Sequence, residues 1–311
     1  MRQRAGVHGN PIASLVAMLA VLSACSPGET PSAESSPMST TPSDASSAPV
    51  TPTPSPRPEA SPTSSPAPQA GTYLALGDSL AVGVGASDPA RLGYVGRIHR
   101  ALGGPALRNL AVSGETSASF REGGQLTAAL EAIRSADPPV SLVTLDIGGN
   151  DLLRLLGSEP CMSQPDSAAC GQAVAATLAA FERNYRAIVG ELRAELDRTA
   201  PGARLAVMTY FNPFSGTDAV YEAGGRLALL GNDLELDCRA ADRDLADRGM
   251  NDIIACVGRR AGAAVADVHP RFVGQGLDLT HIGSEDIHAN DQGYAVIAET
   301  FVRALPAGSA E

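Results

Sequence analysis

The stretch Thr72-Tyr73-Leu74-Ala75-Leu76-Gly77-Asp78-Ser79-Leu80 decides how the chain is interpreted. Its first five residues are mostly apolar and typical of a buried strand, whereas glycine, aspartate and serine are typical turn residues. A serine at the end of a buried strand has a backbone fixed by the sheet and a hydroxyl free to react. A helix beginning there would favour negative charge at its N-terminus. Ser79 is therefore a candidate nucleophile, although the same residues also form ordinary turns.

Apolar strands alternate with helices from residue 71 to about residue 307, which we take as one globular domain. This alternation favours a parallel sheet covered by helices on both faces. In such sheets, binding sites lie at the carboxyl ends of the strands. The pattern predicts strands at 72–76, 107–112, 140–147, 204–208 and 263–268, and helices at 94–102, 125–135, 172–198, 233–262 and 291–305.

Four segments at expected strand ends or before the last helix carry polar residues. Together they supply a serine, a histidine beside carboxylates, and turns with N–H donors. Acyl transfer by a serine nucleophile requires this set. The segments are Gly77-Asp78-Ser79, Ala111-Val112-Ser113-Gly114-Glu115-Thr116, Ile147-Gly148-Gly149-Asn150-Asp151 and Ser284-Glu285-Asp286-Ile287-His288-Ala289-Asn290.

In this order, the four segments resemble the conserved blocks of the SGNH, or GDSL-type, hydrolases, a family of serine esterases and lipases. The resemblance spans residues 71–305 and implies a flavodoxin-like three-layer α/β/α sandwich with a mainly parallel sheet. It implies that Ser79 is the nucleophile and His288 the general base. The N–H groups of Ser79 and Gly114 and the side-chain amide of Asn150 would form an oxyanion hole. It implies no metal and no organic cofactor.

The acid of the triad is where the sequence departs from the family pattern. The family usually has an aspartate three residues before the histidine, but here that position holds Glu285, and Asp286 stands two residues before. The spacing favours Glu285, while Asp286 or a main-chain carbonyl remains an alternative. Ala289 replaces a common proline, which we expect to affect loop rigidity more than chemistry.

The resemblance implies a hydrolase acting on small-molecule or lipid esters. A deacetylase of cell-envelope or plant polysaccharide esters is one alternative, which the absence of tryptophan, a common sugar-stacking residue, weakly disfavours. A non-catalytic binding lipoprotein of the same fold is another. The presence of Ser79, Asn150 and His288 together argues against the second alternative.

The charge of the chain bears on its partners. The formal net charge is −11, and no basic patch with interleaved aromatic residues occurs in the sequence. Nucleic-acid binding normally requires such a patch, so we expect no nucleic-acid partner. We expect the protein to be a monomer.

Residues 1–24 have the pattern of a signal peptide. Arg2 and Arg4 precede an apolar run at 12–22, which is too short to span a membrane as a helix. Leu22-Ser23-Ala24-Cys25 resembles the lipobox of bacterial lipoproteins, which implies cleavage before Cys25 and lipidation of its thiol. The protein would then be exported and anchored at the outer face of the bacterial cell membrane. A plain secretory signal is the alternative.

Residues 25–70 are expected to form a tether between the lipidated Cys25 and the domain at 71–307. Residues 26–70 contain 12 Pro, 12 Ser and 6 Thr, with few large apolar side chains to offset the entropy of ordering. In the polyproline II conformation, this length reaches at most about 140 Å. We therefore expect the catalytic domain to stand clear of the membrane surface.

Five cysteines is an odd number for an exported protein. Assigning Cys25 to the lipid leaves four, which allow three disulfide connectivities. We favour Cys161–Cys170 and Cys238–Cys256, because each pair closes a short loop, with four free thiols as the alternative. A zinc site is not expected, since no C-x-x-C pair is present.

Replacing Cys25 tests the anchor directly. We expect Cys25→Ser to move the protein from the membrane fraction to the soluble fraction, because the thiol that would carry the lipid is lost. Specific activity on a soluble ester should stay unchanged, since the domain itself is intact. Retention of the variant in the membrane fraction would show that another element holds the protein there.

Overall fold

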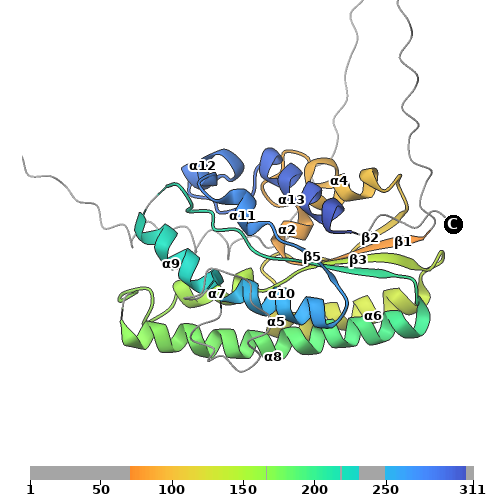
Figure 1. Cartoon of the computed structure of the whole chain (residues 1–311), viewed down its shortest axis with the longest axis horizontal. Coiled ribbons are helices and arrows are strands. Elements are labelled where there is room, and N and C mark those ends of the chain that lie inside the picture. Colours follow the sequence, from red (N-terminus) through yellow and green to blue (C-terminus); the bar gives the residue numbers. More distant parts are fainter. Residues whose placement is uncertain (1–70, 166, 218, 231–248, 306–311) are drawn as a thin grey trace, which may run out of the picture.

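The computed structural model describes residues 71–165, 167–217, 219–230 and 249–305. Its centre is a five-stranded sheet in the order β2-β1-β3-β4-β5, in which every neighbouring pair is parallel (Figure 1). This is the strand order of flavodoxin-like folds, which confirms the predicted fold class. The strands are β1 (Thr72–Gly77), β2 (Ala106–Asn109), β3 (Val140–Asp146), β4 (Arg204–Met208) and β5 (Ala264–Ala266).

Helices cover both faces of the sheet and complete the three layers (Figure 1). One layer is built around the long helix α8 (Ala168–Thr199), which packs on α5 (Ser117–Glu122), α6 (Gln125–Ser135), α7 (Gly149–Leu156) and α10 (Met250–Arg260). The opposite layer is built around α13 (Asp291–Ala304), which packs on α3 (Pro89–Leu92), α4 (Tyr94–Ala101) and α12 (Gly276–Leu279). The remaining elements are α2 (Ser79–Val82), α9 (Ala219–Leu230), α11 (His269–Phe272) and the 3-10 helix η2 (Ile282–Ser284).

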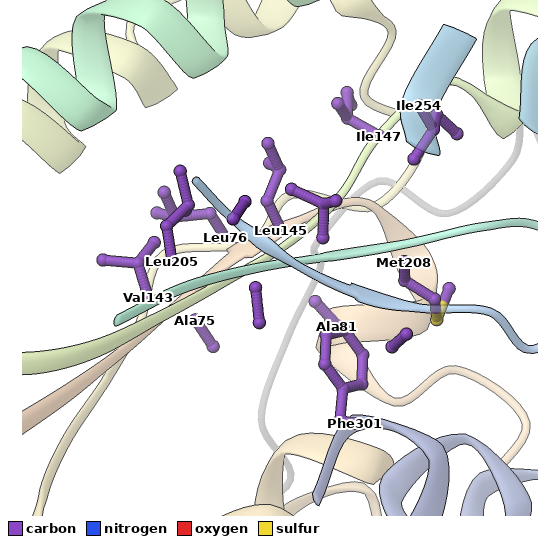
Figure 2. Packing of buried hydrophobic residues seen from close by; sticks show 14 of the residues in the cluster. Ala75, Leu76, Ala81, Val143, Leu145, Ile147, Leu205, Met208, Ile254 and Phe301 are labelled. Atoms are coloured by element: carbon purple, nitrogen blue, oxygen red, sulfur yellow. The ribbon is translucent and has the colours of Figure 1, made fainter. Parts of the chain in front are cut away.

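The hydrophobic core lies on both faces of β1 and β3. All six residues of β1 are buried, as expected for a central strand of a parallel sheet. Successive side chains point to opposite faces, so Leu76 lies on one face of the sheet while Ala75 lies on the other, the same face as Phe301 (Figure 2). A core of this kind fixes the positions of the strand ends from which the site is built.

Several predicted elements differ from the observed ones. β2 ends at Asn109 rather than near residue 112, although the N–H groups of Leu110 and Val112 still donate to the carbonyl oxygens of Ala75 and Gly77 on β1. Helix α7 was not predicted, and it carries a candidate site residue. The predicted helix at 233–262 is represented by α10, and residues 231–248 lie outside the described residues.

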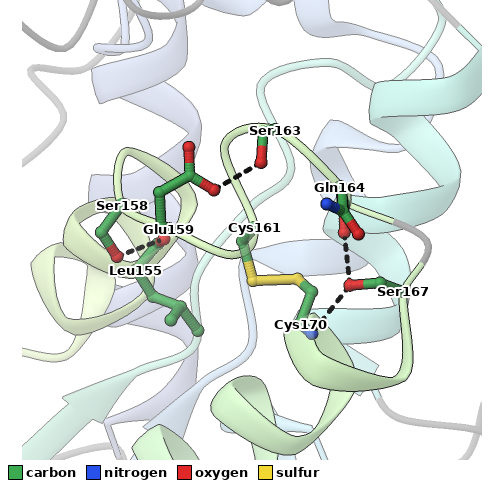
Figure 3. The surroundings of a disulfide bond; sticks show 8 residues. All are labelled: Leu155, Ser158, Glu159, Cys161, Ser163, Gln164, Ser167 and Cys170. Carbon is green, nitrogen blue, oxygen red and sulfur yellow. Dashed lines mark hydrogen bonds between the residues drawn. A yellow bond between two sulfur atoms is a disulfide. The ribbon is translucent and has the colours of Figure 1, made fainter.

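A disulfide joins Cys161, in the loop after α7, to Cys170, in the first turn of α8 (Figure 3). Ser167 caps the same turn by accepting a hydrogen bond from the N–H of Cys170. Cys256 is also disulfide-bonded. Cys238 lies outside the described residues, so the Cys238–Cys256 pair stays a prediction. Within the described ranges, no helix is long and apolar enough to cross a membrane.

Candidate active site

The turn after β1 places Ser79 at the carboxyl edge of the sheet. Gly77 adopts φ +142°, and a Cβ there would lie 2.3 Å from the carbonyl oxygen of Asp146 on the neighbouring strand. Asp78 caps α2, its Oδ1 accepting a hydrogen bond from the N–H of Leu80 at 3.0 Å. Ser79 is therefore the first residue of a short helix that begins where the strand ends.

His288 links Ser79 to a carboxylate. Its Nε2 lies 3.0 Å from the Oγ of Ser79, and its Nδ1 lies 2.6 Å from Oδ1 of Asp286. Burial disfavours the charge on Asp286, but the backbone and ring N–H groups of His288 donate to its carboxylate and leave its pKa below the ordinary value. Asp286 is thus ionised at neutral pH, and a hydroxyl, an imidazole and a carboxylate stand in series.

The structure corrects the preference for Glu285 as the residue that contacts the histidine. Glu285 follows η2 with φ +61°, a left-handed conformation that is uncommon for a non-glycine residue. The next residue, Asp286, accepts hydrogen bonds from both the main-chain N–H and the ring of His288. Asp286 thereby closes a local turn onto the histidine two residues later, and the usual spacing of three is not needed.

Asn150 and Gly114 both border the space beside Ser79. Asn150 is the second residue of α7, and one N–H of its amide donates to the main-chain oxygen of Glu115 at 2.9 Å. An amide carries two N–H groups, so the second remains available for a substrate oxygen. Gly114 has φ +77°, and nothing lies within 4 Å of the position that a Cβ would take. The Gly114 backbone is therefore open toward this space.

Further side chains hold the loop that contains Gly114. Both carboxylate oxygens of Asp151 accept hydrogen bonds from Ser117, one from its N–H at 2.8 Å and one from its hydroxyl at 2.6 Å. Arg154 donates to the carbonyl oxygen of Gly114 at 3.2 Å. Helix α7, which follows β3, thus supplies three side chains, those of Asn150, Asp151 and Arg154, that hold this loop in place.

A mainly apolar cavity of about 210 Å³ opens beside these residues. Its polar lining includes Ser79, Asn150 and His288, and most of its apolar lining comes from α7, α9 and the segment after β4. The segment 212–214 is part of the wall, whereas no residue of the Cys161–Cys170 loop lines this cavity. The apolar lining residues are Leu80, Leu152, Leu153, Leu156, Phe211, Pro213, Phe214, Ala228, Leu229 and Ile287.

Two contacts in the site were not anticipated from the sequence. Gln125, the buried first residue of α6, accepts a hydrogen bond from the N–H of Gly77 at 2.8 Å and donates to Glu115 at 2.9 Å. It therefore joins the Ser79 turn to the Gly114 loop. The hydroxyl of Tyr210 donates to Oδ2 of Asp78 at 2.6 Å. No sequence signal marks either contact, because the burial of Gln125 and the reach of Tyr210 become visible only in the structure.

The described part of the chain contains no group of three or more His, Cys, Asp or Glu side chains that could hold a metal ion. Cys25, the predicted lipidation site, lies outside the described residues.

A parallel α/β/α sandwich with serine, histidine and aspartate at the carboxyl edge of its sheet defines a class, the serine hydrolases of flavodoxin-like fold. Residues 75–296 match the GDSL-like lipase/acylhydrolase family. The chain belongs to this family, and it is a carboxylic ester hydrolase.

Solved structures share the fold. An extracellular lipase from Streptomyces rimosus is similar over 76% of this chain and 100% of its own, with 21% identity and a TM-score of 0.54. Phospholipase A1 from Streptomyces albidoflavus NA297 is similar over 76% of this chain and 100% of its own, with 18% identity and a TM-score of 0.52. No curated protein sequence matches this chain.

We expect replacement of the two adjacent carboxylates, Asp286 and Glu285, to have different effects on kcat/KM. Asp286→Ala should lower kcat/KM by about 100- to 10,000-fold, because the imidazole loses the partner that orients it and stabilises its charge. Glu285→Ala should change kcat/KM by less than about threefold, since its side chain does not contact the histidine. Hydrolysis of a soluble p-nitrophenyl ester by both variants measures the difference. Equal small effects would instead favour a main-chain carbonyl as the partner of His288.

Proposed function

We propose that this hydrolase is a serine esterase or lipase that forms an acyl-enzyme at Ser79. The observation that carries the proposal is the pair of contacts that joins Ser79 to His288 and His288 to Asp286. The three side chains come from two segments far apart in the sequence, and they meet beside an apolar cavity. We see no structural role that would require this series of groups.

The contacts support a two-step reaction. Nε2 of His288 accepts the proton of Ser79 as Oγ attacks the ester carbonyl, and Asp286 stabilises the imidazolium that forms. The imidazolium then gives its proton to the departing alcohol, which leaves an acyl group on Ser79. A water molecule, deprotonated by His288, hydrolyses this acyl-enzyme and restores the serine.

The developing oxyanion would be held by three donors: the N–H of Ser79, the N–H of Gly114 and the free N–H of the Asn150 amide. Two of these groups are fixed before substrate arrives, because Asn150 is bonded to the Gly114 loop and Arg154 holds the carbonyl of Gly114. Preorganised donors of this kind typically contribute about 100- to 1000-fold each to the rate.

The cavity supports an acyl group longer than acetyl. A single water needs only about 10–15 Å³ of such space, whereas the cavity offers about 210 Å³ with a mainly apolar lining. An acetyl group has only three non-hydrogen atoms and would leave most of this lining uncovered. We therefore favour esters of longer acyl chains over acetylated polysaccharides, and no observation supports a non-catalytic binding role.

We further propose that the enzyme is exported and held by a lipid on Cys25. Residues 25–70 would act as the tether and residues 71–307 as the catalytic domain. This part of the proposal depends on the sequence of residues 1–70 alone.

An activity-based probe tests the nucleophile. A fluorophosphonate should label the wild-type protein at one serine, because Ser79 is the serine bonded to His288. Ser79→Ala should abolish labelling. The control is Ser113→Ala, which removes another serine that borders the cavity and should still label. Labelling of Ser79→Ala to the wild-type level would overturn the proposal.

A chain-length series of p-nitrophenyl esters tests the acyl group. Each buried methylene contributes about 0.8 kcal/mol, so kcat/KM should rise up to about fourfold per methylene beyond acetate until the cavity is filled. Ala228→Phe, which adds bulk to the wall, should shift the optimum to shorter chains. A clear preference for acetylated polysaccharide over every ester of the series would favour the deacetylase instead.

A further inference from the structure

Two buried carboxyl groups lie directly beneath the Ser79 turn. Asp78 precedes Ser79 in the chain, and Asp146 ends β3, opposite Gly77 in the register of the sheet. Asp78 is 2% exposed and Asp146 is completely buried. The main-chain N–H of Asp78 points to Oδ2 of Asp146 at 3.4 Å, which brings the two residues close together. The reaction described above uses neither group.

The hydrogen bonds around the two carboxyls are unequal. Asp78 accepts from the N–H of Leu80 at 3.0 Å and from the hydroxyl of Tyr210 at 2.6 Å. Asp146 accepts from the hydroxyl of Tyr94 at 2.5 Å, in addition to the long contact with Asp78. Hydrogen bonds to a carboxylate favour its charged form. The negative charge is therefore better held on Asp78 than on Asp146.

No ion pair among the described residues includes Asp78 or Asp146, so none of their cations balances the pair. Two adjacent buried carboxyls without a cation cannot both ionise at ordinary cost, and they share one proton instead. Burial raises the pKa of Asp146, and the charge of Asp78 raises it further. Burial also raises the pKa of Asp78, although its hydrogen bonds and the nearby His288 oppose this.

The other titratable groups that face the pair are tyrosines, apart from His288. Burial raises the pKa of each hydroxyl, so all of them remain neutral. The two carboxyl groups and these tyrosines therefore carry a single negative charge, while the ionised Asp286 lies beyond His288. The tyrosines are Tyr73 of β1, Tyr94 of α4, Tyr185 of α8, Tyr210 after β4 and Tyr294 of α13.

We propose that Asp146 is a positioning residue that remains a neutral acid and donates a hydrogen bond to the carboxylate of Asp78, so that only one negative charge lies beneath the Ser79 turn. This inference depends on the proposed roles of Ser79 and His288. The single charge on Asp78 favours the imidazolium that forms on His288 as the serine is deprotonated. A second charge on Asp146 would add repulsion close to the developing oxyanion. Activity should therefore fall toward alkaline pH as Asp146 loses its proton.

Replacing Asp146 by residues of similar size tests this role. Asp146→Leu removes the donor, and we expect kcat to fall at least tenfold with little change in KM, because substrate does not touch this residue. Asp146→Asn keeps a neutral donor and should retain at least ten times the kcat of the leucine variant. It should also lose the alkaline decline in kcat that the wild type shows. Equal kcat values for the two variants, or an unchanged alkaline decline in Asp146→Asn, would overturn the proposal.

Infrared spectroscopy provides a readout that does not depend on activity or on the leucine variant folding. At pH 7, the wild type should show the carbonyl stretch of a buried neutral carboxyl, and Asp146→Asn should lack it. Identical spectra in this region would also overturn the proposal. Fluorophosphonate labelling separates the two hypotheses, because labelling of Ser79→Ala overturns the proposed nucleophile, whereas normal labelling with identical spectra overturns the role of Asp146 alone.

Discussion

The parallel pairing of β1 with β3 is the constraint on which the site depends. It sets Gly77 opposite Asp146, so that the turn carrying Ser79 and the loop leading to Asn150 leave the sheet at the same edge. The close approach needs a glycine, because a Cβ at position 77 would lie 2.3 Å from Asp146. The Gly114 loop follows β2 on the other side of β1 and is fastened to both neighbours, by Gln125 to Gly77 and by Asn150 to Glu115.

Much of the fold could be predicted because its signals are local. β1, β3 and β4 are short apolar runs with turn residues after them, and parallel strands buried on both faces have this pattern. The order of the four polar segments then indicated which strand ends would meet. Helix α7 was missed because it has only eight residues and begins at Gly149, after another glycine, which looks like a continued loop. The predicted strand at 107–112 extends past the end of β2 at Asn109. The pattern of apolar residues does not reveal that β2 is exposed at the edge of the sheet.

The site was less predictable where contacts depend on backbone conformation or on distant residues. Counting residues back from His288 favoured Glu285, but the left-handed conformation of Glu285 leaves the contact to Asp286. The hydroxyl of Tyr94 reaches Asp146 across 52 residues, and that of Tyr210 reaches Asp78 across 132. No periodicity or motif marks such pairs, since each tyrosine looks like an ordinary core residue in the sequence.

The loop that carries Asp286 and His288 is closed on itself. Thr280 pairs with Ala289 across its base, and the N–H of His281 donates to the carbonyl oxygen of His288 at 3.0 Å. The carboxylate and the imidazole therefore lie in one local unit, and the contact between His288 and Ser79 joins this unit to a residue 209 positions away in the sequence. The three groups thus come from two parts of the chain: Ser79 belongs to one, and the paired Asp286 and His288 belong to the other.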